Sequence, residues 1–253
     1  MLPANEDNGV LYSHQGLTYG GLIMNENCGA SGILECFSEL RDYLIKEGFK
    51  KLIYKPVPHI YPHLPSEEDL YALFRNNAKL IGRNISCTIL QSNRIKYSNL
   101  RKRTLRKVLN AGLEISESKE YEEFWKVLID NLFEKYGAHP VHSLEEIVKL
   151  SSLFPQIKLF VAKKKEKILA GIVFYVTPKV VHAQYISATK EGKSLGAVDA
   201  IINFGIEHFA YIPYFDMGTS NADQGRFLNE SLIHHKEGFG GRGICYDSYE
   251  LDI

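Results

Sequence analysis

The sequence lacks several signatures that would point directly to one function. Its four cysteines, Cys28, Cys36, Cys87 and Cys245, form no Cys-x-x-Cys pair, which argues against a zinc site or a disulfide framework. No basic-then-apolar leader opens the chain, and no apolar run reaches the length of a membrane span, so we expect a cytoplasmic protein. The formal net charge is +0. No global field therefore attracts nucleic acid or an acidic membrane surface.

The composition is that of an ordinary globular chain. Hydrophobic residues make up 45% of the 253 residues and charged residues 24%, which is typical of a folded domain with a sizeable core. The length suits either one large domain or two small ones.

The first part of the chain predicts a short α/β segment. Strands are expected over 10–14 and 17–23, where glycines interrupt the pattern. Apolar residues at helical spacing predict a helix over 32–46, which Ser31 caps and Gly48 ends. A strand is expected over 51–57.

A basic segment follows. Seven basic residues and no acidic one lie between Arg94 and Lys107. Apolar residues in the same run predict an amphipathic connector helix that Gly112 ends. Two interpretations are open: a solvated helix face, or a surface for the phosphates of a polyanion.

The second part of the chain carries a fuller set of elements. A helix that contains Trp125 and a helix opened by the Ser143 capping box come first. Three strands, a helix and a further strand follow, expected over 158–163, 168–177, 180–187, 195–209 and 211–217.

The most informative stretch comes last. A strand that ends in Asp216-Met-Gly218 leads through a helix to Lys236-Glu-Gly-Phe-Gly240. These landmarks, together with the element order over 116–253, resemble the acyltransferase repeat of FemAB-like proteins in the GNAT superfamily. The resemblance implies an α/β (α+β) fold with a mixed sheet flanked by helices.

The same resemblance implies a tandem arrangement. It divides the chain into a partial GNAT-like repeat (1–93), the basic connector helix (94–112) and a complete GNAT-like domain (113–253). The first repeat is shorter than is common, so the chain starts inside a repeat or this half is reduced. A second copy that completes it would make a homodimer.

The resemblance also implies a donor site. In GNAT domains the pantetheine arm of acyl-CoA enters between two splayed strands, here 180–187 and 211–217. The pyrophosphate lies on a loop at a helix N-terminus. Lys193, Ser194, Gly196 and Ala197 are the candidate cofactor-binding residues, although Val198 departs from the expected small residue. The alternative is a left-handed cap or tight turn at Gly192 and Gly196.

Three residues are candidates for catalysis. Acylation of an amine needs a proton acceptor, and His182 and Asp216 lie at the edge of the expected gap. Lys236 could stabilise a phosphate or an oxyanion. Each also has a structural interpretation: a packed strand histidine, an aspartate that anchors a turn, and a lysine that caps its helix.

The first segment offers candidate substrate-binding residues. His14, Gln15 and Tyr19 lie in a polar, glycine-rich stretch that either lines a cleft or forms a bulged strand. His59 and His63 alternate as metal ligands do, but no carboxylate completes a site, so no metal is expected.

The expected function is that of an acyl or aminoacyl transferase that acylates an amine. The acceptor would be an amino sugar or a cell-envelope precursor. The donor would be acetyl-CoA or another acyl-CoA, or a charged tRNA as in FemAB-like enzymes of the peptidoglycan-bridge type. The rival hypothesis is a non-catalytic binding or assembly module that has lost donor binding.

Overall fold

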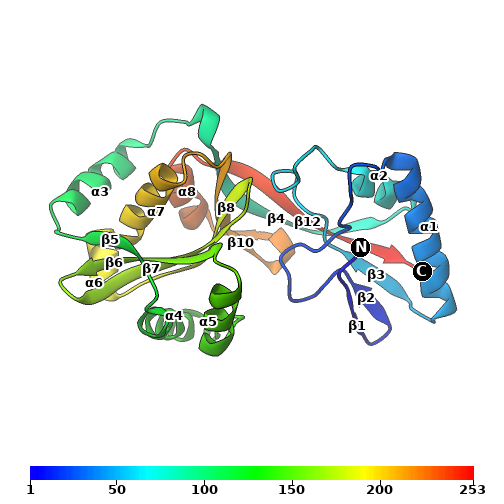
Figure 1. The fold of residues 1–253 in the computed structure, drawn as a ribbon, viewed down its shortest axis with the longest axis horizontal. Helices are drawn as coiled ribbons and strands as arrows, with labels where there is room; N and C mark the ends of the chain where they lie inside the picture. Colours follow the sequence, from blue (N-terminus) through cyan, green and yellow to red (C-terminus); the bar gives the residue numbers. More distant parts are fainter. The chain divides into compact units, whose positions relative to one another are not determined.

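The computed structural model describes the backbone of residues 1–253 and all side chains except those of Leu109, Lys135 and Tyr136. The chain divides into two compact units (Figure 1). The first unit comprises Met1–Ser86, Thr219–Glu230 and Gly243–Ile253, and the second comprises Cys87–Gly218 and Ser231–Arg242. Helices flank strands of a mixed sheet in both, which confirms the expected fold class.

The first unit has its strands in the order β1-β2-β3-β12-β4. Strand β2 is parallel to β3, and β12 is antiparallel to β3. Apolar residues of helix α1 pack with strand residues such as Leu52 and Leu251. The elements are β1 (Asn5–Asp7), β2 (Val10–Tyr12), α1 (Ala30–Lys46), β3 (Lys51–Tyr54), α2 (Glu68–Arg75), β10 (Asn221–Ala222), η2 (Asp223–Gly225), β11 (Phe227–Leu228) and most of β4 (Lys79–Leu90) and β12 (Arg242–Asp252).

The second unit has the order β4-β9-β8-β7-β6-β5, with the last four strands connected in antiparallel fashion. Its elements are η1 (Gln91–Asn93), α3 (Asn99–Leu109), β5 (Glu114–Ser118), α4 (Tyr121–Tyr136), α5 (Leu144–Leu153), β6 (Ile157–Lys164), β7 (Lys167–Val176), β8 (Val180–Ala188), α6 (Lys190–Leu195), α7 (Ala197–His208), β9 (Tyr214–Thr219) and α8 (Glu230–Glu237).

Both faces of this second sheet are covered. Along β6, Leu159 and Val161 pack with Trp125 of α4, whereas Phe160 and Ala162 join the core that includes α7. Figure 1 shows α4 and α5 on one side of these strands and α7 on the other. Successive strand residues point to opposite faces, which explains why β6 and β7 read as continuous apolar runs.

One predicted helix cap is present, and another is not. The Ser143 side chain accepts a hydrogen bond from the Glu146 amide, and the Glu146 carboxylate accepts one from the Ser143 amide, so the predicted capping box is confirmed. The predicted helix over 32–46 is α1 (Ala30–Lys46), but the predicted cap at Ser31 is wrong, because the helix already begins at Ala30 and its N-cap is Gly29.

Some predicted elements differ. Residues 17–23 form no regular strand. Their backbone makes isolated hydrogen bonds instead, such as the one that the Gly20 amide donates to the Lys55 carbonyl. The Ser13 carbonyl lies so close to Gly20 that a side chain would clash. The predicted helix that contains Trp125 was expected to start at Ser118, but it begins at Tyr121, because residues 114–118 pair with β6 as β5.

The stretch before α7 also differs from the predicted loop. It contains the short helix α6, because the Thr189 hydroxyl accepts a hydrogen bond from the Gly192 amide and starts a helical turn. The predicted repeat boundaries at 93 and 112 divide the chain differently from the two compact units, which share β4. The repeat boundaries stay a prediction.

Two glycine-to-alanine substitutions test the placement of α6. A Cβ at Gly192 would lie 2.1 Å from the Leu169 carbonyl oxygen, whereas one at Gly32 in α1 would meet nothing within 4 Å. We expect Gly192→Ala to lower the free energy of unfolding by about 1–3 kcal/mol through overpacking. Gly32→Ala should raise it by about 0.5–1 kcal/mol, because alanine costs less backbone entropy in a helix.

The measurement is urea unfolding followed by circular dichroism. A Gly192→Ala protein as stable as the wild type would mean that α6 does not pack against Leu169 as described.

Candidate functional site

Strands β8 and β9 form a fork. They pair in parallel at Val180–Tyr214, Val181–Phe215 and His182–Asp216. Beyond these, β8 runs on to Ala188 and β9 to Thr219 with no further register pairs in the described backbone. The fork therefore opens directly after His182 and Asp216.

A bulge in β8 lies at the same level. Val173 of β7 faces Tyr185 and its neighbour Phe174 faces Ala183, so Gln184 is an inserted residue. Bulges bend a strand and increase its local twist, and this one accompanies the departure of β8 from β9. The splay that the GNAT resemblance implied is thus present in the backbone.

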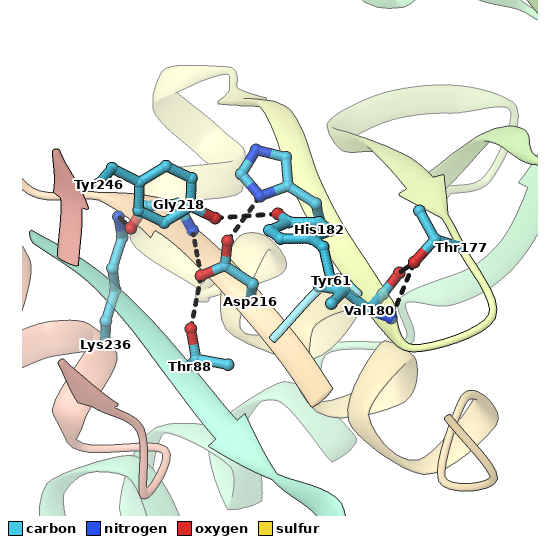
Figure 2. Close-up of polar contacts among 9 residues, drawn as sticks. All are labelled: Tyr61, Thr88, Thr177, Val180, His182, Asp216, Gly218, Lys236 and Tyr246. Atoms are coloured by element: carbon cyan, nitrogen blue, oxygen red, sulfur yellow. Dashed lines mark hydrogen bonds and ion pairs between the residues drawn. The ribbon is translucent and has the colours of Figure 1, made fainter. Parts of the chain in front are cut away.

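Asp216 is the hub of the polar contacts at the fork. Its carboxylate is fully buried. The Thr88 hydroxyl donates to Oδ1 at 2.8 Å, and the His182 Nδ1 lies 2.7 Å from Oδ2 (Figure 2). A buried carboxylate is tolerated only when such donors replace water. These contacts account for its position at the inner end of the fork.

The same contact orients His182. When Nδ1 donates to Asp216, a neutral imidazole carries its lone pair on Nε2 and can accept a proton there. The His182 side chain keeps 16% of its surface exposed, against 0% for Asp216. Asp216 is thus the buried member of the pair and orients the imidazole. His182 is the partly exposed member and can exchange protons.

Lys236 belongs to the same region. Its Nζ donates to the Gly218 carbonyl at 2.8 Å, two residues beyond Asp216 (Figure 2). Burial lowers the pKa of the Lys236 amine to about 8, although the nearby Asp216 charge opposes that shift. Burial raises the pKa of the Cys87 thiol to about 12, which disfavours the nucleophilic thiolate at neutral pH.

The structure therefore brings together the three predicted catalytic residues, Asp216, His182 and Lys236; their catalytic roles stay predictions. Sequence reasoning missed Thr88. It lies in β4, which no pattern singled out, and only its contact with Asp216 marks it.

The predicted donor loop is a capped helical turn. The Gly192 amide is bonded to Thr189, and Gly196 ends α6 in the left-handed conformation (φ 75°). The alternative of a left-handed cap is thus observed at Gly196. Gly192 is helical, and a glycine is needed there for the close Leu169 carbonyl.

A cavity of about 490 Å³ lies beside this turn. Gly196 starts α7 with no side-chain cap among the described residues. The partial positive charge of the helix N-terminus lies there, and Asp199 in the first turn offsets part of it. The cavity's lining includes Lys193 and Ser194, two of the predicted cofactor-binding residues, together with Lys107 of α3. Ala197, the fourth of that set, is fully buried at the start of α7.

The basic helix is not a uniformly solvated face. Arg101 is buried and forms an ion pair with Asp199 of α7, whose second oxygen lies 2.7 Å from the His235 Nε2 of α8. Lys102, Arg103, Arg106 and Lys107 are exposed. Arg101 is thus part of a contact, centred on Asp199, that joins α3, α7 and α8. The four other basic residues named here face solvent.

The predicted substrate-binding residues lie in the first unit. Gln15 hydrogen-bonds with Asn5, and Tyr19 packs 4.6 Å from the Tyr61 ring. His14 has a positive φ of 63°, and its buried Nδ1 has no hydrogen-bond partner among the residues that the structure describes. Their role in binding stays a prediction.

Among the described residues, no three His, Cys, Asp or Glu side chains are grouped as metal ligands. Within the same residues, no helix has both the length and the hydropathy needed to cross a bilayer.

No family model and no curated protein matches the sequence. Solved structures do match. FemX has a TM-score of 0.70 at 10% identity, covering 96% of this chain and 81% of that one. The C-terminal domain of a putative lysylphosphatidylglycerol synthetase from Agrobacterium fabrum has a TM-score of 0.66 at 10% identity, covering 98% and 79%.

A third match is L-PGS from Bacillus licheniformis, with a TM-score of 0.63 at 11% identity, covering 98% of this chain and 79% of that one. At such identities the similarity concerns the fold. The chain has a fold like that of FemX and of these synthetase domains, which confirms the FemAB-like fold that the landmarks after Asp216 predicted.

The buried lysine makes a pH-dependent contribution to stability. The pKa of the Lys236 amine is about 8 in the folded chain, against the usual value of 10.5 for a lysine. Between these values the unfolded chain binds the extra proton, so raising the pH favours folding. We expect the wild type to gain stability over Lys236→Met from pH 8 to pH 10, by up to about 1.4 kcal/mol per unit.

Urea unfolding at pH 7, 8, 9 and 10, followed by the fluorescence of the single tryptophan, Trp125, in the same unit, measures this difference. A stability difference that stays constant across the range would contradict the burial of the amine.

Proposed function

We propose that the protein is a GNAT-fold acyl or aminoacyl transferase that acylates an amine. The observation that carries the proposal is the fork between β8 and β9, with the His182–Asp216 pair at its inner end. A fork of this kind leaves room for an extended acyl donor between two strands. His182 lies at its inner end, and we propose that the acyl group meets its acceptor beside this histidine.

The chemistry follows from the geometry. Formation of the amide bond requires the acceptor amine to lose a proton, and His182 Nε2 takes it while Asp216 stabilises the resulting imidazolium. The C–N bond forms and the bond from the carbonyl carbon to the thiol or hydroxyl leaving group breaks. That leaving group then recovers a proton.

Lys236 supplies a positive charge opposite the oxyanion of the transition state. In its protonated form it stabilises the oxyanion that develops on the carbonyl, a task for which a preorganised and water-poor site is best suited. Its pKa of about 8 also makes it a competent proton donor to the leaving group near neutral pH.

The cavity beside α7 supports a donor that carries phosphates. Lys107 and Lys193 line it together with Gly196 at the start of α7 and with the paired Arg101 and Asp199, and cations near a helix N-terminus suit a phosphate. Acyl-CoA and aminoacyl-tRNA share this chemistry. One of the structural neighbours is named for a lysylated lipid, which keeps the aminoacyl donor in the proposal.

We propose a small-molecule amine as acceptor, such as an amino sugar or a cell-envelope precursor. The rival function is a binding module of the same fold that no longer takes a donor. The α6 turn favours this rival, because its amides are bonded within the chain. The open fork favours the transferase.

Substitutions at the fork test the catalytic roles. We expect His182→Ala to lower kcat by roughly 10²–10⁴-fold, because the amine loses its proton acceptor. Asp216→Asn should lower it as well and change the pH–rate profile, since the imidazolium loses its counter-charge. His139→Ala, which removes an exposed histidine of the same unit, is the matched control.

The readout is the rate of amide formation. It is measured with the donor that the binding experiment described next identifies. Equal rates for His182→Ala and His139→Ala would remove His182 from the mechanism.

Donor binding is tested by calorimetry with acetyl-CoA, longer acyl-CoAs and a charged tRNA. We expect one donor class to release heat and to raise the melting temperature. Neutralising Lys102, Arg103 and Lys107 to glutamine should weaken it, because exposed cations on α3 contribute phosphate contacts. Arg101 is left intact, because it is committed to Asp199. A chain that binds no donor of either class would support the binding module.

A further inference from the structure

The first unit contains a cavity that the proposed transfer chemistry does not use. Its volume is about 720 Å³, which lies in the range of small-molecule sites. All of its lining residues belong to Leu22–Asp69, so the cavity lies within the first unit. It is bounded by the loop before α1 and by the proline-rich connector between β3 and α2.

Three of the ionisable groups of the lining are carboxylates. Glu26, Glu68 and Asp69 contribute carboxylates, His63 contributes an imidazole, and the lining residues include no lysine or arginine. Two helices begin at this cavity, α1 after Gly29 and α2 at Glu68. Each N-terminus contributes about half a positive charge. Their sum of about +1 is smaller than the charge of the carboxylates.

Asp69 is the buried member of the set. Its residue is 5% exposed, and burial raises the pKa of its carboxyl. The Tyr54 hydroxyl donates to Oδ2 at 2.7 Å and itself accepts the Leu22 amide at 2.7 Å. This relay holds the carboxylate and the Leu22 wall of the cavity in one arrangement. A cation is the ligand that would stabilise the ionised form.

The remaining walls are mainly apolar. Met24, Val57, Leu64 and Pro65 line the cavity beside the carboxylates. Contacts of this kind bury a hydrocarbon body at about 25 cal/mol per Å², while charge-assisted hydrogen bonds hold the cationic end.

We propose that this cavity binds an organic monocation: a primary amine on a hydrocarbon body, with the ammonium group held by Glu68 and Asp69. The site takes its ligand independently of the transferase reaction. This proposal and the proposed function can therefore be confirmed or rejected independently.

Cys28 provides a local reporter. It lines the cavity and is partly exposed, whereas Cys36 of α1 and Cys245 of β12 are exposed and lie outside it. The experiment follows maleimide labelling of each cysteine in the full chain by peptide mass spectrometry. The probes are n-hexylamine, n-hexanol and hexanoate, which share a hydrocarbon body and differ in charge.

We expect hexylamine to slow labelling of Cys28 and to leave Cys36 and Cys245 unchanged. Glu68→Gln should weaken this protection about tenfold, as loss of a charge-assisted hydrogen bond predicts. Glu35→Gln, on the exposed face of α1, should leave it unchanged. If Glu68→Gln does not fold, the comparison of hexylamine with hexanol on the wild type carries the test.

The absence of protection by hexylamine would overturn the proposal. So would equal protection by hexanol, which would assign the cavity to neutral apolar ligands. Stronger protection by hexanoate would mean that the helix N-termini outweigh the carboxylates.

Discussion

A buried carboxylate at the point where two parallel strands separate is the constraint on which the second unit depends. Strands that diverge leave backbone groups without ladder partners, and side chains must take over part of the hydrogen bonding. Asp216 does so at the last paired position, where it accepts from Thr88 on one neighbouring strand and contacts His182 on the other. Three strands are thereby joined by one side chain. Its burial forces those contacts to be satisfied together.

A second polar network holds the helices around the fork. Asp199 of α7 contacts Arg101 of α3 and His235 of α8, and His235 precedes Lys236. A buried ion pair costs desolvation energy and adds little net stability, but breaking it is expensive because a charge is left unpaired. The network therefore defines where α8 lies, and with it where the Lys236 amine reaches the Gly218 carbonyl.

The candidate site was partly accessible from sequence. Asp216, His182 and Lys236 could be singled out because they sit at a strand end, in mid-strand and before a glycine turn. Thr88 could not, since a threonine in an unrecognised strand gives no signal until its partner is known. The conformation of the predicted donor loop was not accessible from sequence. A glycine pattern does not reveal that the Thr189 hydroxyl has already bonded the Gly192 amide.

Local chemistry by itself determined the periodic elements: the apolar spacing of α1, the Ser143 capping box and the hydrophobic runs of β6 and β7. These depend on neighbours a few residues away in the chain. Only the tertiary structure decided that Asp216 meets Thr88, 128 residues away, and that β8 and β9 part after His182. Burial creates these pairings, because a desolvated charge must find donors wherever in the sequence they occur.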